Sequence, residues 1–446
     1  MVDVSVAGGG SFNDLQVIDG QGRPVRAQIH ACMDAHNVHT SSPTANVRLF
    51  FEVRVPPMGV ATYYLRRASK SDRLEKKNLV EYVMTELIEI ERSSGRITSG
   101  GGGGGRGGGI RGAAGKSNEE GTVFRRRTTW FEDVDSIKIK TDVFGDGDQS
   151  TSRIILGTGR ITLQFQKWSG SIQSVHRKGG TGTGNSASSA SSASSSGSGQ
   201  AMTRKVSQEW MRYTSSRSGA YLFRPHGSAS TDRGESDRVI IAVTRGKLIQ
   251  SVRYYASHVE QITTLMNING PMGDVIHLIP SSVANMNEEV VLRWNTDIRA
   301  GGEFWTDNGA ELMLRKINNG APVPANFYPM NAGMSLREKN SNVKNGGNGG
   351  GSITGRRQVM ILNEHPMACA SLTSDPNGAS MEMMVARSLR EDDGRGLAQG
   401  VHDSSRAYAP LYLLLDESVR AQSKVRKEKR RSKKEYISKE LNCCFY

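Results

Sequence analysis

The chain has 446 residues, of which 36% are apolar and 51 are glycine, and its formal net charge is +14. This length allows two or three domains, but the low apolar share predicts that part of the chain lies outside any packed core. Residues 420–439 contain ten Lys or Arg and two Glu. The net positive charge of this segment is more than half of that of the whole chain. The rest is only mildly basic, so charge gives little support for a nucleic-acid-binding protein.

Residues 1–66 have the pattern of a small antiparallel β domain. Apolar residues alternate between 15 and 29 on both sides of the turn sequence 19–22, which predicts a hairpin. Two more strand-like runs lie within 47–64. The first residues carry no basic flank followed by an apolar stretch, so we expect no targeting signal. No run approaches the ~20 apolar residues of a membrane segment.

Residues 67–150 have a weaker pattern and are expected to form a linker. The run 81–92 (EYVMTELIEIER) fits either a pair of strands or a short helix. Residues 100–109 are almost pure glycine. Because such a run cannot bury enough surface to offset its conformational entropy, we predict a flexible low-complexity insertion.

Strand patterns return at Arg153 and continue to residue 415. Short apolar runs recur at close spacing, separated by Gly, Asn and Asp turns such as Asp307-Asn308-Gly309. One of the expected strands is Tyr221-Leu222-Phe223. No helical pattern alternates with these strands, so we predict an all-β fold class, with a large antiparallel sandwich over 151–415.

Three further segments differ from this pattern. The runs 179–200 and 340–352, rich in Gly with Ser or Asn, are expected to be flexible insertions in the loops of the sandwich. Residues 416–446 carry the basic cluster and contain Cys443 and Cys444 close to the end. We expect this tail to be disordered, because its charges favour solvation over packing.

Two motifs near the first glycine run are weak indications of nucleotide or RNA binding. The run 109–117 (GIRGAAGKS) resembles a phosphate-binding loop, but Ile110 stands where that motif requires glycine and no strand or helix pattern flanks it. Arg106 lies within glycines, as in Arg-Gly repeats of RNA-binding segments, but without aromatic neighbours. We therefore expect neither an ATP site nor a nucleic-acid partner.

Residues 30–39 contain five side chains of metal-ligand type. Their spacing fits no familiar tetrahedral pattern, and Pro43 follows in a segment typical of a loop, so solvated loop residues are the better interpretation. We expect no metal site in this chain. The five residues are His30, Cys32, Asp34, His36 and His39.

Asp392 and Asp393 place two carboxylates beside Arg395, with Gly394 and Gly396 between and after them. Such a charged cluster is most often a solvated turn. Glycines also allow a turn to present a charged side chain to a sugar. The spacing alone leaves both interpretations open.

Several stretches share one family's order and spacing. They are ITLQFQKWSGSIQSV at 161–175, SGAYLFRP at 218–225, FWTDNG at 304–309, NFYP at 326–329 and EMMVARSLREDDGRGLAQG at 382–400, preceded by VPPMG at 55–59. Together they resemble the C-terminal half of Golgi-type (class II) α-mannosidases of glycoside hydrolase family 38. The resemblance covers most of the chain outside the low-complexity runs and the tail.

The resemblance implies a galactose-mutarotase-like supersandwich and an enzyme that trims α-linked mannose from N-glycans in the Golgi lumen with retention. Family members bind zinc and carry the nucleophile in an N-terminal α/β domain, expected to precede Met1. None of the nine histidines here begins the family's His-x-Asp zinc motif. The resemblance thus implies no catalytic residue and no zinc ligand in this chain, which depends on the missing N-terminal domain as a partner.

The resemblance also implies two substrate-binding residues. Tyr221 matches a family tyrosine whose hydroxyl reaches the sugar pocket, and Arg395 matches an arginine at the same pocket. Asp392 and Asp393 are expected to orient this turn. Without the family, an aromatic residue in the core of the sandwich is an equally good interpretation of Tyr221.

Two hypotheses of other classes remain. The first is a non-catalytic carbohydrate-binding or scaffold sandwich, which predicts glycan binding by an independently stable chain. The second is a basic RNA-binding protein, which predicts binding with a steep salt dependence. For the mannosidase hypothesis we expect poor solubility, because a sandwich without its catalytic domain exposes an apolar face.

Overall fold

The computed structural model describes residues 2–4, 14–31, 47–55, 57–75, 79–83, 85–92, 122–133, 136–144, 154–166, 170–177, 202–231, 238–256, 258–339, 356–372 and 378–418. Within them nearly all the regular secondary structure is strand, in five sheets, with one short α-helix, α1 (Lys70–Glu75), and two short 3-10 helices. The predicted all-β class is confirmed. Nearly all strand pairs are antiparallel, β4 with β7 being a parallel pair.

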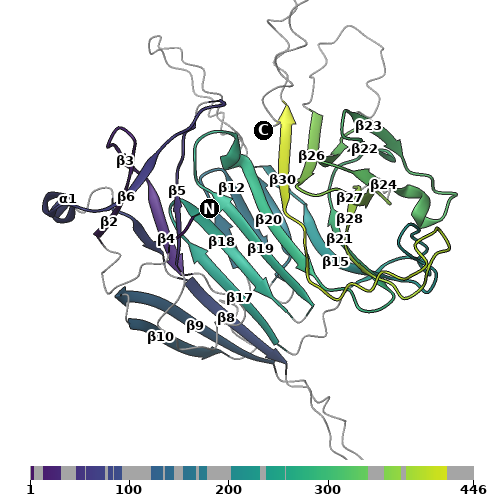
Figure 1. Ribbon diagram of the computed structural model, residues 1–446, viewed down its shortest axis with the longest axis horizontal. Helices are drawn as coiled ribbons and strands as arrows, with labels where there is room; N and C mark the ends of the chain where they lie inside the picture. The colour runs from purple at the N-terminus through teal and green to yellow at the C-terminus, as the bar shows by residue number, and fades with distance from the viewer. Residues whose placement is uncertain are drawn as a thin grey trace, which may run out of the picture.

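The N-terminal unit, which Figure 1 shows in purple, holds two small sheets. The first has the order β1-β5-β4-β7 and the second the order β3-β2-β6. The strands are β1 (Val2–Val4), β2 (Leu15–Asp19), β3 (Pro24–Val25), β4 (Ala27–Ala31), β5 (Val47–Phe51), β6 (Tyr63–Arg67) and β7 (Glu81–Val83).

The core of this unit contains Val17, Ile29, Leu49 and Val80, all buried. The predicted hairpin at the turn 19–22 is confirmed, since β2 pairs with β3. Strand β7 and Val80 belong to the same unit, so the predicted limit at residue 66 falls too early. After α1 the chain comes back as β7, which pairs with β4. The spacing of apolar residues along the sequence does not predict this pairing.

The largest sheet has thirteen strands and runs across the whole molecule (Figure 1). Its order is β10-β9-β8-β17-β18-β19-β20-β30-β26-β25-β22-β23, with β29 beside β20. Its strands are β8 (Thr85–Arg92), β9 (Thr122–Asp133), β10 (Ser136–Phe144), β17 (Arg238–Arg245), β18 (Ile249–Tyr255), β19 (Val259–Met266), β20 (Val275–Ser282), β22 (Glu303–Asp307), β23 (Leu312–Lys316), β25 (Gly333–Arg337), β26 (Arg356–Asn363), β29 (Ala407–Tyr408) and β30 (Leu411–Ser418).

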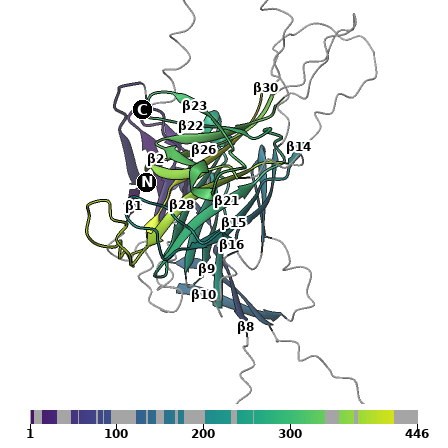
Figure 2. The same ribbon diagram turned by 90° about the vertical axis from the view of Figure 1, so that its right-hand side faces the viewer.

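Two smaller sheets complete the sandwich. Their orders are β11-β12-β13-β14 and β16-β15-β21-β28-β27-β24, and Figure 2 shows β15 beside β21. The strands are β11 (Ile154–Gly157), β12 (Ile161–Phe165), β13 (Ile172–Arg177), β14 (Met202–Arg204), β15 (Ser207–Thr214), β16 (Ser230–Thr231), β21 (Glu288–Asn295), β24 (Phe327–Met330), β27 (Met367–Ala370) and β28 (Ser380–Ser388).

One continuous hydrophobic core joins the three sheets. Its largest side chains with under 2% exposure are Trp294, Phe165 and Phe304. In β19 every second residue faces this core, and the residues between, such as Thr264, are only half-buried. This period of two gives the large sheet one packed face and one partly open face.

Gln28 connects the N-terminal unit to the large sheet. Its side chain is buried, its Nε2 donates to the carbonyl oxygen of Ile249 at 3.0 Å, and its Oε1 accepts from Leu248 N at 3.1 Å and Ile249 N at 2.9 Å. Gly246 lies so close that a Cβ atom there would meet Gln28 Oε1 at 2.1 Å. The joint between the two parts is therefore tight and specific.

The structure differs from two predictions about strands. The run 81–92 forms β7 and β8, and β8 pairs with β17 and β9, so part of the expected linker belongs to the large sheet. Tyr221-Leu222-Phe223 is not a strand but part of the loop between β15 and β16. Its backbone groups bond to side chains instead of a neighbouring strand, as described below.

Other predictions lie outside the described residues: the glycine run 100–109, the phosphate-loop-like run 109–117, and the insertions 179–200 and 340–352. Most of the basic tail lies outside them too. Strand β30 extends to Ser418, so the first three residues of the predicted tail are strand. None of the described helices is long and apolar enough to cross a bilayer.

Candidate functional site

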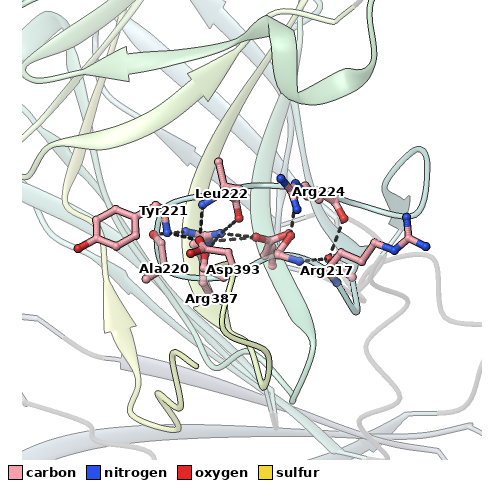
Figure 3. Close-up of polar contacts among 11 residues, drawn as sticks. Arg217, Ala220, Tyr221, Leu222, Arg224, Arg387 and Asp393 are labelled. Carbon is pink, nitrogen blue, oxygen red and sulfur yellow. Dashed lines mark hydrogen bonds and ion pairs between the residues drawn. The ribbon is translucent and has the colours of Figure 1, made fainter. Parts of the chain in front are cut away.

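Tyr221 lies on the loop between β15 and β16, with 64% of its surface exposed. Figure 3 shows its ring pointing away from a cluster of polar contacts that holds the loop backbone. An exposed aromatic ring on a fixed backbone has a free face for stacking and a hydroxyl for hydrogen bonding. The alternative interpretation of Tyr221, an aromatic residue in the core of the sandwich, is therefore wrong.

Asp393 supports this loop from the segment that follows β28. Its Oδ2 accepts hydrogen bonds from the backbone N–H of Tyr221 at 2.7 Å and of Leu222 at 2.8 Å. A Cβ atom on Gly219 would meet the Asp393 side chain at 2.6 Å, so this approach requires glycine. Asp393 thus holds the loop that carries Tyr221, whereas the sequence predicted that it supports the turn of Arg395.

Arg387, on β28, supports the same loop through its carbonyl oxygens. Its guanidinium donates to Gly219 O at 3.0 Å, Leu222 O at 3.2 Å and Ala220 O at 3.4 Å (Figure 3). Asp393 binds N–H groups of this turn and Arg387 binds its carbonyls. These bonds replace the ladder that a strand would have supplied, which is why 221–223 is a loop.

Glu289 holds Arg387 in place. The two residues are direct cross-strand partners on β21 and β28, and Glu289 Oε1 accepts from Arg387 Nη2 at 2.7 Å and Nε at 3.0 Å. Glu289 is fully buried. Burial raises its pKa, and the charge and hydrogen bonds of Arg387, with a hydrogen bond from Ser218, partly offset that rise.

Two serines close the loop on itself. Ser215 Oγ donates to Arg224 O at 2.7 Å and accepts from Ser218 N at 2.7 Å. Ser218 Oγ accepts from Arg224 N at 2.7 Å and donates to Glu289 Oε2 at 3.3 Å. The loop ends are thereby tied together and to the buried Glu289.

An aromatic cluster holds the loop through the ring of Phe223. The rings of Phe223 and Phe327 meet edge to face at 4.9 Å, and Phe223 meets Tyr213 at 5.2 Å. Tyr213 is almost fully buried and its hydroxyl donates to Glu382 Oε2 at 2.7 Å. Burial and the adjacent Glu382 carboxylate raise the pKa of Tyr213. Phe223 faces the core while Tyr221 faces solvent.

Arg395 and Asp392 lie on the same segment as Asp393, and both are exposed. Gly394 and Gly396 have φ values of 70° and 104°, which a residue with a side chain rarely adopts. Among the described residues Asp392 makes no hydrogen bond or ion pair, so its supporting role is not visible.

Asp393 is linked electrostatically to Arg395. Desolvation acts to raise the pKa of Asp393, but bonds from the backbone N–H groups of Tyr221, Leu222 and Arg395, and then the Arg395 charge, outweigh it and lower that pKa. The loop of Tyr221 and the segment of Arg395 therefore meet at one ionised carboxylate.

Sequence reasoning missed Ser215, Glu289 and Arg387 as supporting residues. Arg387 falls within the quoted motif 382–400, but nothing in that motif distinguishes it from Arg390 or Arg395. An arginine among apolar residues in a buried strand was the available indication, since such a charge requires a partner.

A metal site is not formed by the described residues, in which no three His, Cys, Asp or Glu side chains gather closely enough to hold an ion. Of the five candidates in 30–39, His30 is described, and its ring stacks on Phe50 at 4.6 Å. The others, Cys32, Asp34, His36 and His39, lie outside the described residues.

Comparison with known proteins agrees with this architecture. The model of the glycosyl hydrolases family 38 C-terminal domain matches residues 156–395. α-Mannosidase 2 of Drosophila melanogaster is 26% identical over 412 residues, covering 91% of this chain and 29% of the relative. α-Mannosidase 2x of Mus musculus is 30% identical over 226 residues, covering 50% and 18%.

Among solved structures, an α-mannosidase from Enterococcus faecalis V583 overlaps 92% of this chain and 38% of its own, at 9% identity and a TM-score of 0.41. This chain spans less than a third of the two curated relatives. The residues matched by the family model lie in the β sandwich of a glycoside hydrolase. The chain belongs to glycosyl hydrolases family 38, whose C-terminal domain it carries.

Proposed function

We propose that this chain forms the sugar-facing C-terminal region of a Golgi α-mannosidase that trims mannose-containing N-glycans. A separate N-terminal α/β domain supplies the zinc and the nucleophilic carboxylate of a retaining mechanism. The family match and the names of the mannosidase 2 relatives support the substrate class. The Golgi compartment rests on the resemblance of the sequence motifs to Golgi-type members. In this proposal the present chain contributes binding residues and no catalytic ones.

The observation that carries the proposal is the braced, exposed Tyr221. A phenol held on a fixed backbone loses little conformational entropy when a sugar stacks on it or accepts its hydrogen bond. The bonds from Asp393 and Arg387 to the loop backbone provide that preorganisation.

Arg395 is proposed to act beside Tyr221 at the same pocket. A guanidinium has several donors in a fixed plane and can hold two adjacent sugar oxygens at once. Asp393 links the two segments, because it accepts from Tyr221 N and lies within the electrostatic reach of Arg395. We propose this link as the way in which both side chains keep a common orientation.

The test compares two proteins with an aryl α-mannoside as substrate: this 446-residue chain, and the longest protein encoded by its transcript once the 5′ end is mapped. We expect hydrolysis by the longer protein and none by the chain alone. In the longer protein, Tyr221→Phe should lower kcat/KM about tenfold, the size of one lost hydrogen bond at the reacting sugar. Tyr64→Phe changes a tyrosine that is 54% exposed on the N-terminal unit and serves as the control.

Two results contradict the proposal. Hydrolysis by the chain alone would place the catalytic groups within it. A transcript that begins at Met1, with mannose oligosaccharide binding that Tyr221→Ala abolishes, favours the non-catalytic carbohydrate-binding alternative. That alternative rests on the same exposed Tyr221.

A further inference from the structure

One edge of the large sheet is open to a further strand. Strand β23 forms one end of the thirteen-stranded sheet and β10 forms the other (Figure 1), and no described strand pairs with the outer edge of β23. Leu312, Met313 and Leu314 are 38%, 37% and 42% exposed. Successive residues of a strand point to opposite faces, so β23 shows apolar side chains to solvent on both faces. Such an edge favours pairing with another strand.

A hydrogen bond at the end of β23 establishes which backbone groups face outward. Ile317 N donates to Gly302 O at 2.9 Å, so the backbone of Ile317 turns toward the β22 side. Backbone groups alternate in direction along an antiparallel strand. The N–H and C=O groups of Leu312, Leu314 and Lys316 therefore point away from β22, toward the open edge.

This edge is complementary to a second copy of itself. A two-fold axis that relates two antiparallel edge strands stands perpendicular to their sheet, so it brings together residues from the same face of each copy. With the axis at Met313, Leu312 lies opposite Leu314 of the second copy. In the same register Glu311, directly before β23, lies opposite Arg315 of the second copy.

The backbone and the charges favour this register over its neighbours. Leu312 and Leu314 are opposite each other and both have outward-facing backbone groups, so the two edges can exchange hydrogen bonds. An axis at Leu312 or at Leu314 separates Glu311 from Arg315. Opposite charges directly across a strand pair are stabilising, and the register at Met313 forms two such pairs by symmetry.

Glu311 and Arg315 are placed to form these pairs. Glu311 is exposed, and its carboxylate makes no hydrogen bond or ion pair with the described residues. Arg315 Nε donates to Thr306 Oγ1 at 3.0 Å, and its guanidinium lies over the ring of Tyr328 at 4.6 Å. These contacts hold the guanidinium, but none of the described carboxylates pairs with it. Glu311 of a second copy supplies that carboxylate.

We propose that two copies of this chain associate through β23, which joins their large sheets into one continuous antiparallel sheet. One pair of short strands buries less area than most stable interfaces, so the affinity lies in the micromolar range. The association follows from the geometry of the strand and does not depend on the mannosidase assignment.

Sedimentation velocity of the 446-residue chain over a range of concentrations tests this, and we expect a monomer–dimer equilibrium. Glu311→Arg and Arg315→Glu each place like charges opposite each other and should weaken association by about tenfold or more. An equimolar mixture of the two variants should form dimers again, because each copy then carries the charge that the other lacks. Glu391→Arg, the same change of charge at an exposed residue outside β23, is the control.

Cross-linking tests the register and does not require the charge variants to fold. Directly opposite residues without mutual hydrogen bonds have Cα atoms about 4.5 Å apart, within the range of a disulfide. Met313→Cys should therefore form a covalent dimer on mild oxidation. Leu312→Cys should not, because Leu314 of the second copy lies opposite it. The parent chain gives the background from its own cysteines.

Four results overturn the proposal. The chain stays monomeric at every concentration, the mixed charge variants associate no better than either alone, or Leu312→Cys cross-links as readily as Met313→Cys. The fourth is a longer protein, mapped from the transcript, that stays monomeric under the same conditions, because the edge is then covered in the whole enzyme. Since no hydrolysis is measured, failure of the mannosidase assignment leaves these results unaffected.

Discussion

At the scale of the residue, Gly219 is the position where the Tyr221 loop tolerates least change. A methyl group there meets Asp393 at 2.6 to 2.8 Å, including its backbone nitrogen. We expect Gly219→Ala to lower the free energy of unfolding by about 1–3 kcal/mol, because the loop and Asp393 must separate. Urea denaturation measures this. Gly159→Ala adds a methyl group in open space and should cost no more than about 0.5 kcal/mol.

Arg387 offers a second prediction at this scale. Arg387→Met leaves the buried Glu289 without its cation and removes the side-chain donor from the carbonyls of Gly219 and Leu222, of which Leu222 O keeps the bond from Gly219 N. We expect a loss of about 3–5 kcal/mol in the free energy of unfolding. The double variant with Glu289→Leu should recover at least half of that loss, since no uncompensated charge remains. Equal losses in the single and double variants would show that the ion pair is not what holds the loop.

At the scale of the element, Gln28 connects β4 to the turn before β18. Gln28→Leu keeps the volume but removes three hydrogen bonds, for a loss of about 2–4 kcal/mol. Hydrogen exchange should quicken at Leu248 and Ile249 while the core of β21 stays protected. Gln173→Leu, at an exposed position of β13, is the control. Unchanged exchange at both amides would mean that the joint does not depend on Gln28.

The sequence predicts the strands and turns well where local pattern decides them. The alternation around Leu15 and the Asp307-Asn308-Gly309 turn both correspond to observed hairpins. The Tyr221 loop was not predictable from its own residues. Its backbone partners come from Arg387 and Asp393, more than 160 positions further along the chain. Hydrogen bonds between residues so far apart in the sequence do not change the local pattern of apolar residues.

At the scale of the whole molecule, two half-buried histidines with lowered pKa make stability depend on pH. Burial lowers the pKa of His30 from 6.5 to about 4 and also lowers that of His277. Below pH 6.5 the histidine is protonated in the unfolded chain but stays neutral in the folded one. The free energy of unfolding therefore falls as the pH drops toward 4. His30 alone contributes on the order of 3 kcal/mol to this loss.

The variant His30→Phe tests this, because it keeps a ring against Phe50 and removes the titration. Its unfolding free energy, measured by urea denaturation between pH 7 and 4, should fall less steeply than that of the parent chain. Above pH 7 the two slopes should agree. Parallel curves across the whole range would contradict a buried neutral His30.

The position of β30 has a consequence for how the protein is made. This strand, residues 411–418, lies between β20 and β26 in the middle of the thirteen-stranded sheet. During translation β20 and β26 emerge from the ribosome long before the segment that joins them. Until then each has an unpaired edge, which favours association with other nascent chains. Completion of the sheet therefore requires the late strand β30 to insert between two parts of the sheet that are made before it.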